Sequence, residues 1–442
     1  MANEKNESLD VNSLVTNFNE SLGLSTWLEV AVKEPTRRNT TTIGIQDSYV
    51  VYLIESTITD RSKIFSGWLE KRNDETFEGS SQIDHESFPS TISVWRRYSE
   101  FDILKDYLMV TFPYLVIPPL PEKRLTGAWQ AASTTSSDNA DPEFLERRRI
   151  YLEQFLKRIF TLSDVSQDQV LLSFLYTEEW KEVVASSKYH SLRDSRLKSL
   201  SASYRIKKPN DKFELIKKYA QDLQQYVGGI LKCRAKATEH LYGIHKIHSN
   251  YGREFSEWSS IERKDMAEGL QKMGHYLDNF AQDIDMCIEG EEDFADQLKE
   301  YYGYCESLRH LCKKQELMQL DLEQLGDALA SKRIDRENLS QGKTGIFGGF
   351  KAKVFGGNTP EQKEGKLKAL DEEILKMEEK VKASTESLTD FEEKALANVE
   401  RFSKQKMADV TDIFVTHVMM TLERCKKSRA TWQHIKKACE CV

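Results

Sequence analysis

Apolar and polar positions follow two different periods along the chain, one in each half. In the first half, short segments alternate between apolar and polar residues or are rich in β-branched and aromatic residues, which is typical of strands. We predict strands over 27–32, 48–54 and 92–98. In the second half, apolar residues recur every three or four positions over long distances, which is typical of helices that pack along a seam. A small α+β domain followed by an all-α domain is therefore expected.

Helices are also predicted after the third strand of the first half. Ser99 is expected to cap the first of them, with Asp102 in the capping-box position; its apolar stripe is Phe101, Leu104 and Leu108. The second begins at Pro142, because Asp141 can cap it and proline is favoured at the first helical position. Its buried face is Leu152, Phe155, Leu156 and Ile159. A last short helix is predicted over 170–175, and the segments 60–90 and 130–140 are expected to be loops.

Proline is nearly absent from the second half. Seven of the nine prolines lie at or before Pro142, and only Pro209 and Pro360 follow. Since proline breaks helix interiors, we predict three helices of roughly 50 to 80 residues, each about 75 to 120 Å long. The middle helix is expected over 263–340, and the Gly-, Lys- and Phe-rich segment 342–360 at one end of an elongated coiled-coil rod. A thin rod has a poor ratio of core to surface, so dimerisation is expected.

Composition narrows the class of protein. The chain has 442 residues, 30% of them charged, and a net charge of -8, which disfavours a nucleic-acid binder. It contains no run of roughly 20 apolar residues that could span a membrane. The first 24 residues are polar and lack a signal-peptide core, so we expect a disordered tail over 1–24 and a cytoplasmic protein. The seven cysteines are then expected to be reduced.

Three cationic segments stand at predicted boundaries of strands and helices: 96–101 (RRYSEF), 118–123 (PPLPEK) and 146–149 (ERRR). An arginine fork binds phosphate bidentately, a lysine adds a point charge, and a neighbouring tyrosine offers a flat face to a ring. These residues favour recognition of a phosphorylated sugar. The histidines 240, 245 and 248 lack the spacing of a shared metal site. We therefore expect no enzyme activity, no cofactor and no metal.

The order of these motifs resembles a known architecture. Strand, Arg-Arg-Tyr-Ser-Glu-Phe, helix, Pro-Pro-Leu-Pro-x-Lys, loop and Arg-rich helix resembles a PX (phox homology) domain. The three long helices resemble a BAR domain, a curved dimer that senses or imposes membrane curvature. Together they resemble the sorting nexins with BAR domains. The resemblance implies an α+β PX domain over 25–182, with a three-stranded sheet and helices, and an all-α BAR domain over 209–442.

The resemblance also implies a ligand, phosphatidylinositol 3-phosphate, and the residues that hold it. By their places in the motif, Arg97 would bind the 3-phosphate, Tyr98 would pack under the inositol ring, Lys123 would contact the 1-phosphate and Arg148 would hydrogen-bond the 4- and 5-hydroxyls. For Arg96, Arg147 and Arg149, solvated or structural charge is the favoured interpretation.

Four apolar residues are candidates for membrane insertion. Leu125 and Trp129 follow Lys123 in the predicted loop, where they could enter the bilayer interface or pack on their own domain. Leu197 and Leu200 belong to a predicted basic amphipathic linker helix over 186–208, which could insert or pack on the rod as an ordinary linker.

As a sorting nexin, the chain is expected on the cytoplasmic side of early endosomes. It would form or stabilise tubules for endosomal recycling of cargo, with a role in autophagy, as a homodimer or as a heterodimer with another BAR-containing sorting nexin. The alternative is a coiled-coil scaffold that uses the PX fold mainly to dock protein. In that case Pro118–Pro121 could bind an SH3 domain.

Overall fold

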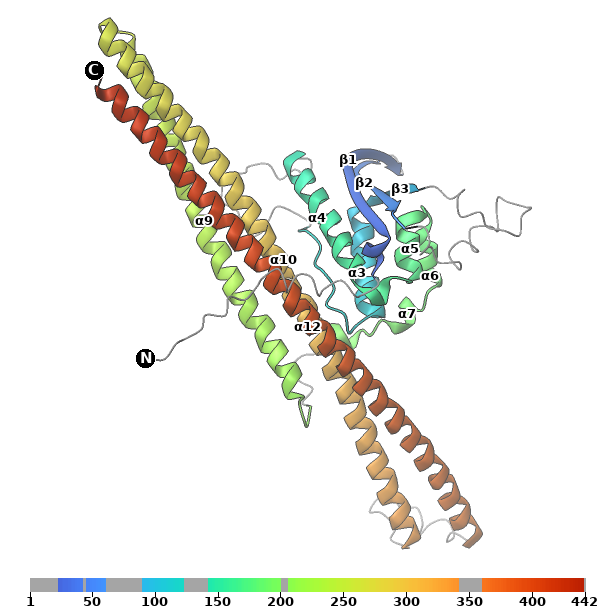
Figure 1. Ribbon diagram of the computed structural model, residues 1–442. Helices are drawn as coiled ribbons and strands as arrows, with labels where there is room; N and C mark the ends of the chain where they lie inside the picture. Colours follow the sequence, from blue (N-terminus) through green and yellow to red (C-terminus); the bar gives the residue numbers. More distant parts are fainter. Residues whose placement is uncertain are drawn as a thin grey trace, which may run out of the picture.

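The computed structural model of the protein describes residues 23–42, 45–60, 90–122, 142–199, 206–341 and 360–440. An α+β domain lies against the middle of a long helical rod (Figure 1). The predicted fold class is confirmed. The predicted loops over 60–90 and 130–140, the segment 342–360 and the tail fall almost entirely outside the described residues.

The described strands form one antiparallel sheet in the order β1-β2-β3. They are β1 (Leu28–Thr42), β2 (Ile45–Ile58) and β3 (Thr91–Arg97), each close to or longer than predicted. The register places Val32, Ile54 and Val94 in one row across the sheet, and all three are buried. The sheet therefore has one face turned to the core, as the alternation predicts. Leu24, assigned to the tail from the sequence, is fully buried in the same core, so the ordered domain begins before residue 25.

Helices cover the buried face of the sheet. They are α3 (Tyr98–Thr111), α4 (Pro142–Phe160), α5 (Gln169–Tyr176) and α6 (Trp180–Ser186), with short 3-10 turns η1 (Leu24–Thr26) and η3 (Ser163–Val165). Rings pack edge to face at the centre of this core: Phe174 has its centroid 5.1 Å from that of Phe101 and 4.9 Å from that of Trp180. All the predicted apolar positions on α3 and α4 are buried. Helix α6, which was not predicted, adds Trp180 to the core.

The predicted cap of α3 is wrong. The helix begins at Tyr98, one residue before Ser99, and its N-cap is Arg97. The side chain of Glu100 accepts a hydrogen bond of 2.7 Å from the backbone N–H of Arg97. A carboxylate reaching back from the third helical position satisfies an N–H that would otherwise lack a partner. Glu100, rather than Asp102, therefore closes the start of this helix.

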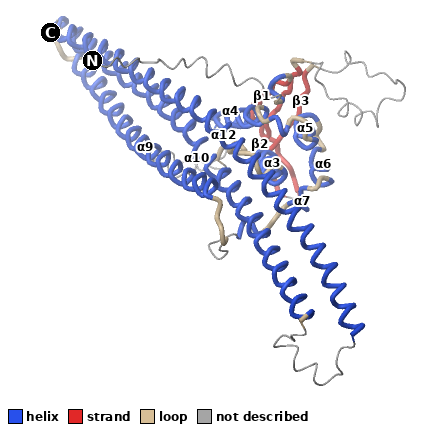
Figure 2. Tube along the Cα trace, turned by 60° about the horizontal axis from the view of Figure 1, so that its bottom comes forward, coloured by secondary structure: helices blue, strands red, loops and turns tan. Residues whose placement is uncertain are grey.

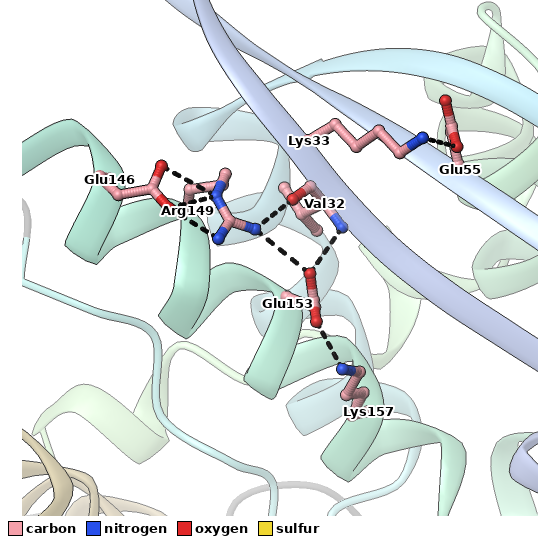
Figure 3. A network of polar contacts seen from close by, with 7 residues as sticks. All are labelled: Val32, Lys33, Glu55, Glu146, Arg149, Glu153 and Lys157. Atoms are coloured by element: carbon pink, nitrogen blue, oxygen red, sulfur yellow. Dashed lines mark hydrogen bonds and ion pairs between the residues drawn. The ribbon is translucent and has the colours of Figure 1, made fainter. Parts of the chain in front are cut away.

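Helix α4 is bound to the edge of the sheet by the polar network in Figure 3. The backbone N–H of Val32 donates to Glu153 at 3.0 Å, and its carbonyl accepts from Arg149 at 2.5 Å. Arg149 also bonds Glu146. Because β1 is an edge strand, these side chains satisfy backbone groups that a neighbouring strand would otherwise have to pair. Arg149 is thus a structural residue, in agreement with the interpretation from the sequence.

The rod consists of three long helices: α9 (Asp211–Ser259), α10 (Lys264–Ser340) and α12 (Pro360–Glu440). Their lengths and bounds agree closely with the prediction. Asn210 caps α9 by accepting a 3.1 Å bond from the N–H of Lys212, and Pro360 occupies the first position of α12. Helix α9 has 49 residues, against 77 in α10 and 81 in α12. The far part of the rod is therefore a two-helix arm of α10 and α12 alone, as Figures 1 and 2 show.

The seam of the rod has a continuous core in its middle, and single buried residues such as Leu277 and Leu329 continue it toward both ends. Its central core includes Ala220, Leu308, Leu311, Ala395 and Phe402, each at most 3% exposed. Other large apolar side chains on α9 and α12 are exposed, and these include Ile244, Tyr251, Trp258, Phe414, Val418 and Leu422. One chain therefore covers only part of the apolar surface that its sequence provides.

The predicted single linker helix over 186–208 is wrong in its described part. Short helices α7 (Tyr189–Leu192) and α8 (Arg196–Ser199) replace it. The break occurs because Asp194 accepts a 2.9 Å bond from the backbone N–H of Arg196, which competes with helix continuation. Arg196 also pairs with Asp321 of α10 at 2.7 Å, and Lys207 with Asp327 at 2.6 Å. These contacts correspond to the alternative of a linker packed on the rod.

Partly buried ion pairs join the α+β domain to the rod. Arg158 of α4 lies 3.0 Å from Glu300 of α10 and 2.6 Å from Asp409 of α12. Burial alone would lower the pKa of Arg158, but the two carboxylates raise it above its usual value. Arg147 pairs with Glu292 of α10. The sequence favoured solvated or structural charge for Arg147, and the structure identifies the structural role as attachment between the domains.

Candidate functional site

The two arginines of the Arg-Arg-Tyr motif have opposite environments. Arg96 is 1% exposed and donates to the carbonyls of Trp95, Ser173, Phe174 and Thr177. Arg97 is exposed, because successive residues of a strand point to opposite faces of the sheet. Only Arg97 is therefore available to a ligand, and Arg96 holds the end of α5.

Arg97 lies at the junction of β3 and α3, over an aromatic ring. Its guanidinium carbon is 3.3 Å from the ring centroid of Tyr49 on β2. Such cation–π stacking orders a guanidinium while leaving its N–H edge open. Tyr49 was not singled out from the sequence. The register could have identified it, since Val51 pairs with Arg97 and Tyr49 lies two residues away on the same face.

Tyr98 is half-buried and points to residues 116–122, which form a proline-rich turn. Its hydroxyl donates a 2.5 Å hydrogen bond to the carbonyl of Pro121. Burial, with a smaller effect from Asp102, raises the pKa of Tyr98, so the hydroxyl stays protonated and remains a donor. The ring is thereby fixed in orientation against the turn.

Arg148 comes to the same place from α4. Its guanidinium carbon lies 4.7 Å from the ring centroid of Tyr98 and 4.2 Å from that of Phe144. It also donates a 3.2 Å hydrogen bond to the carbonyl of Glu122, and its side chain is largely buried. The structure thus brings Tyr98 and Arg148 together from different helices. Phe144 was missed from the sequence, although it stands four residues before Arg148 on one helix face.

The remaining predicted site residues are not placed in the site. Lys123 follows Glu122 directly but lies outside the described residues, as do Leu125, Trp129 and Leu200. Leu197 is half-buried on α8, away from this cluster in sequence and next to the ion pairs that hold the linker to the rod.

The turn from Val116 to Glu122 is covered on one side by the rod. Val116 belongs to the apolar core of the rod, and Pro118 is buried. Pro119 packs closely on Gly303 of α10. If Gly303 carried a Cβ, that atom would lie 2.5 Å from the Cβ of Pro119. An SH3 domain would need the proline faces free, so this packing disfavours the use of Pro118–Pro121 as such a ligand.

Beside these contacts, a cavity of about 410 Å³ lies between the turn, α4 and the rod. Its walls include Pro119, Phe144, Arg148, Tyr151, Tyr302 and Gly303. The cavity shares Arg148 with the site described above. One residue of the site, Arg148, thus also faces the junction of the two domains.

The arrangement can bind anions and a ring by means of exposed and stacked arginines beside a fixed tyrosine. Within the described residues, no group of three His, Cys, Asp or Glu side chains is placed to hold a metal ion. None of the described helices is both long enough and apolar enough to cross a membrane.

The chain is similar to known proteins in sequence and in fold. The PX domain family model matches residues 86–178. Sorting nexin-4 of Mus musculus is 40% identical over 421 residues, covering 94% of this chain and 88% of that protein. Sorting nexin-4 of Homo sapiens is also 40% identical, over 94% of this chain and 90% of that protein. Sorting nexin-4 of Saccharomyces cerevisiae is 25% identical over 79% of each chain.

A solved structure shares the whole architecture. The cryo-EM structure of the SNX-BAR Mvp1 tetramer aligns with a TM-score of 0.58 and 15% identity, covering 92% of this chain and 99% of that one. At this identity the match shows the fold alone. Together with the close relatives, it means that the chain belongs to the sorting nexins, peripheral membrane proteins of membrane trafficking, in the group that joins a PX domain to a BAR-like rod.

Proposed function

We propose that the protein binds phosphatidylinositol 3-phosphate on the cytoplasmic face of early endosomes. Arg97 binds the 3-phosphate, Tyr98 packs under the inositol ring, Lys123 contacts the 1-phosphate and Arg148 hydrogen-bonds the 4- and 5-hydroxyls. The observation that carries the proposal is the convergence of Tyr98 and Arg148 on the carbonyls of one turn, beside an exposed arginine.

The environment of each arginine suits its proposed role. Arg97 is exposed and ordered by the ring of Tyr49, so its fork can meet a phosphate without a large loss of side-chain freedom. Arg148 is stacked on two rings and tied to the carbonyl of Glu122, which fixes the direction of its remaining donors. A stacked, bonded arginine is suited to neutral hydroxyls, where geometry matters more than long-range attraction.

The rod supplies the second part of the proposal, a curved dimer. The exposed apolar residues along α9 and α12, such as Tyr251, Trp258, Phe414 and Val418, are the surface that a second BAR-containing chain would cover. The partner is another copy or another sorting nexin of the same group. Two headgroup sites in one dimer increase avidity on a membrane without any new contact.

We assign to this dimer the formation or stabilisation of endosomal tubules that return cargo from early endosomes, with a role in autophagy. These activities belong to the PX domain, whose core extends from Leu24 to Tyr189, and to a BAR domain over 209–442. The membership of the chain among the sorting nexins supports this assignment.

Liposome flotation with the full chain tests the proposal. Vesicles of constant net charge would carry either phosphatidylinositol 3-phosphate, phosphatidylinositol 4-phosphate or phosphatidylserine. The variant Arg97→Ala removes the proposed phosphate ligand. The matched control Lys157→Ala removes one positive charge from the exposed end of α4, in the same domain.

Selective flotation with the 3-phosphate lipid, lost in Arg97→Ala and kept in Lys157→Ala, is the expected result. Equal flotation with the three lipids, to the same extent in the three proteins, would overturn the proposal. The scaffold alternative would then be favoured.

A further inference from the structure

The proposed lipid-binding residues Arg97, Tyr98 and Arg148 are called the headgroup site below. The proline-rich turn, residues 116–122, lies between this site and the rod and contacts both. We propose that Gly303 and Ser307 of α10 are positioning residues for the headgroup site, so that the rod takes part in forming the lipid-binding geometry. The inference rests on the proposed function and extends it from the PX domain to the rod.

The rod side of the turn is held by three kinds of contact. The hydroxyl of Ser307 donates a 2.6 Å hydrogen bond to the carbonyl of Ile117, and both residues are buried. Val116 is 2% exposed and packs in the apolar core of the rod. Pro119 lies directly on Gly303. The first half of the turn is therefore shaped by α10 as much as by its own domain.

The site side of the turn orients the proposed ligands. The carbonyl of Pro121 accepts from the hydroxyl of Tyr98, and the carbonyl of Glu122 accepts from Arg148. Lys123 is the next residue along the chain. A shift of the turn therefore moves the acceptors that fix Tyr98 and Arg148.

Gly303 is the residue of the rod at which an added side chain would disturb the turn most directly. A Cβ at residue 303 would lie 2.5 Å from Cβ and 2.8 Å from Cγ of Pro119, distances that side chains do not tolerate. The pyrrolidine ring cannot rotate away, because it is closed onto its own backbone. An alanine at 303 must therefore displace the turn or the helix.

The affinity of the full chain for a soluble headgroup measures this displacement without the contribution of membrane charge or avidity. Isothermal titration with a short-chain phosphatidylinositol 3-phosphate is suited to it. Gly303→Ala is expected to raise the dissociation constant by about tenfold, since misplacing positioning groups by a fraction of an ångström weakens a preorganised site strongly.

A matched control is available on the same helix. A Cβ added to Gly326 would meet no atom within 4 Å. Gly326→Ala raises helix propensity as Gly303→Ala does, but it leaves the turn untouched and is expected to bind like the wild type. Both variants would be titrated at a temperature at which circular dichroism shows them fully folded.

Ser307 provides a second, independent pair of variants. Ser307→Ala removes the donor to Ile117 and is expected to weaken headgroup binding by a few-fold. Ser307→Thr keeps the hydroxyl and is expected to retain most of the affinity. If Ser307 acted only by filling space, threonine should reduce the affinity more than alanine, because threonine differs more from serine in size. The expected order of affinities is the reverse.

The possible outcomes separate the inference from the function on which it rests. Wild-type affinity in both Gly303→Ala and Ser307→Ala would overturn the inference and leave the proposed function intact. Absence of selective binding by the wild type itself would overturn both. If Gly303→Ala fails to fold, the Ser307 pair still decides the question.

Discussion

Replacement of Arg96 by methionine should destabilise the PX domain strongly, whereas the same change at its neighbour Arg97 should not. Methionine has a similar length and no charge, so it fills the space of Arg96 without its donors. The change removes the hydrogen bonds to the carbonyls of Phe174 at 2.9 Å and of Trp95 at 3.1 Å. It also removes a long contact to the carbonyl of Ser173 and a short one to that of Thr177.

The loss of unfolding free energy is the contribution of the lost hydrogen bonds minus the cost of burying the charged guanidinium, which the variant no longer bears. Hydrogen bonds made by a charged donor contribute about 1.5 to 3 kcal/mol each, and buried carbonyls left unpaired carry a further penalty. Burial also lowers the pKa of Arg96 to about 10, which shows that the charged form is itself costly to bury. The lost bonds outweigh the relieved desolvation, and the net loss of unfolding free energy is expected to be about 3 kcal/mol.

Urea unfolding followed by tryptophan fluorescence measures this loss. The ring of Trp180 lies 5.9 Å from the guanidinium of Arg96, so it reports on the same region. For a domain of this size the loss corresponds to a fall in melting temperature of about 10 °C. Arg97→Met should change stability by less than about 0.5 kcal/mol, as exposed substitutions do, and should abolish selective lipid binding. Equal stability of the two variants would refute the reasoning.

Two further predictions concern buried charges. Burial alone would raise the pKa of Glu100, but hydrogen bonds, first of all from Lys181, hold it below the usual value of 4.5. The stability that wild type has over Glu100→Gln should therefore be present above about pH 4.5 and disappear as the pH falls below it; a difference in urea unfolding that is independent of pH would contradict this. Arg158→Met leaves Glu300 and Asp409 without their cation, at a cost of about 3 to 5 kcal/mol. It should loosen the attachment of the PX domain to the rod, which other contacts such as that of Pro119 with Gly303 also maintain; small-angle scattering identical to that of wild type would contradict this.

Much of the architecture could be predicted because it depends on local pattern. The bounds of the rod helices follow from Pro209, Pro360 and the spacing of apolar residues. The alternation along β3 also distinguishes Arg96 from Arg97, since Arg96 continues the buried row of Ile92 and Val94. The motif placed Tyr98 and Arg148 in one site, and the structure brings them together.

The errors and omissions arise where two separate parts of the chain meet. A basic amphipathic pattern predicted one linker helix, but the side chain of Asp194 ends it by bonding the N–H of Arg196. Nothing in the sequence near Arg158 indicates that its partners stand about 140 and 250 positions later, at Glu300 and Asp409. The covering of Pro119 by Gly303 likewise depends on how the PX domain lies on the rod, which no local period encodes.

Because the PX domain is attached to the middle of the rod, a small rotation at this attachment causes a large displacement at the end of the rod. From Gly303, where the turn rests, to Ser340 at the end of α10, the two-helix arm extends about 55 Å at 1.5 Å per residue. A rotation of about 6° at the joint would move its end by about 6 Å, given that length. This is most of a Debye length, about 8 Å, at physiological salt. The stiffness of the partly buried ion pairs near Arg158 would thus set how far the end of the arm stands from a membrane bound at the proposed headgroup site.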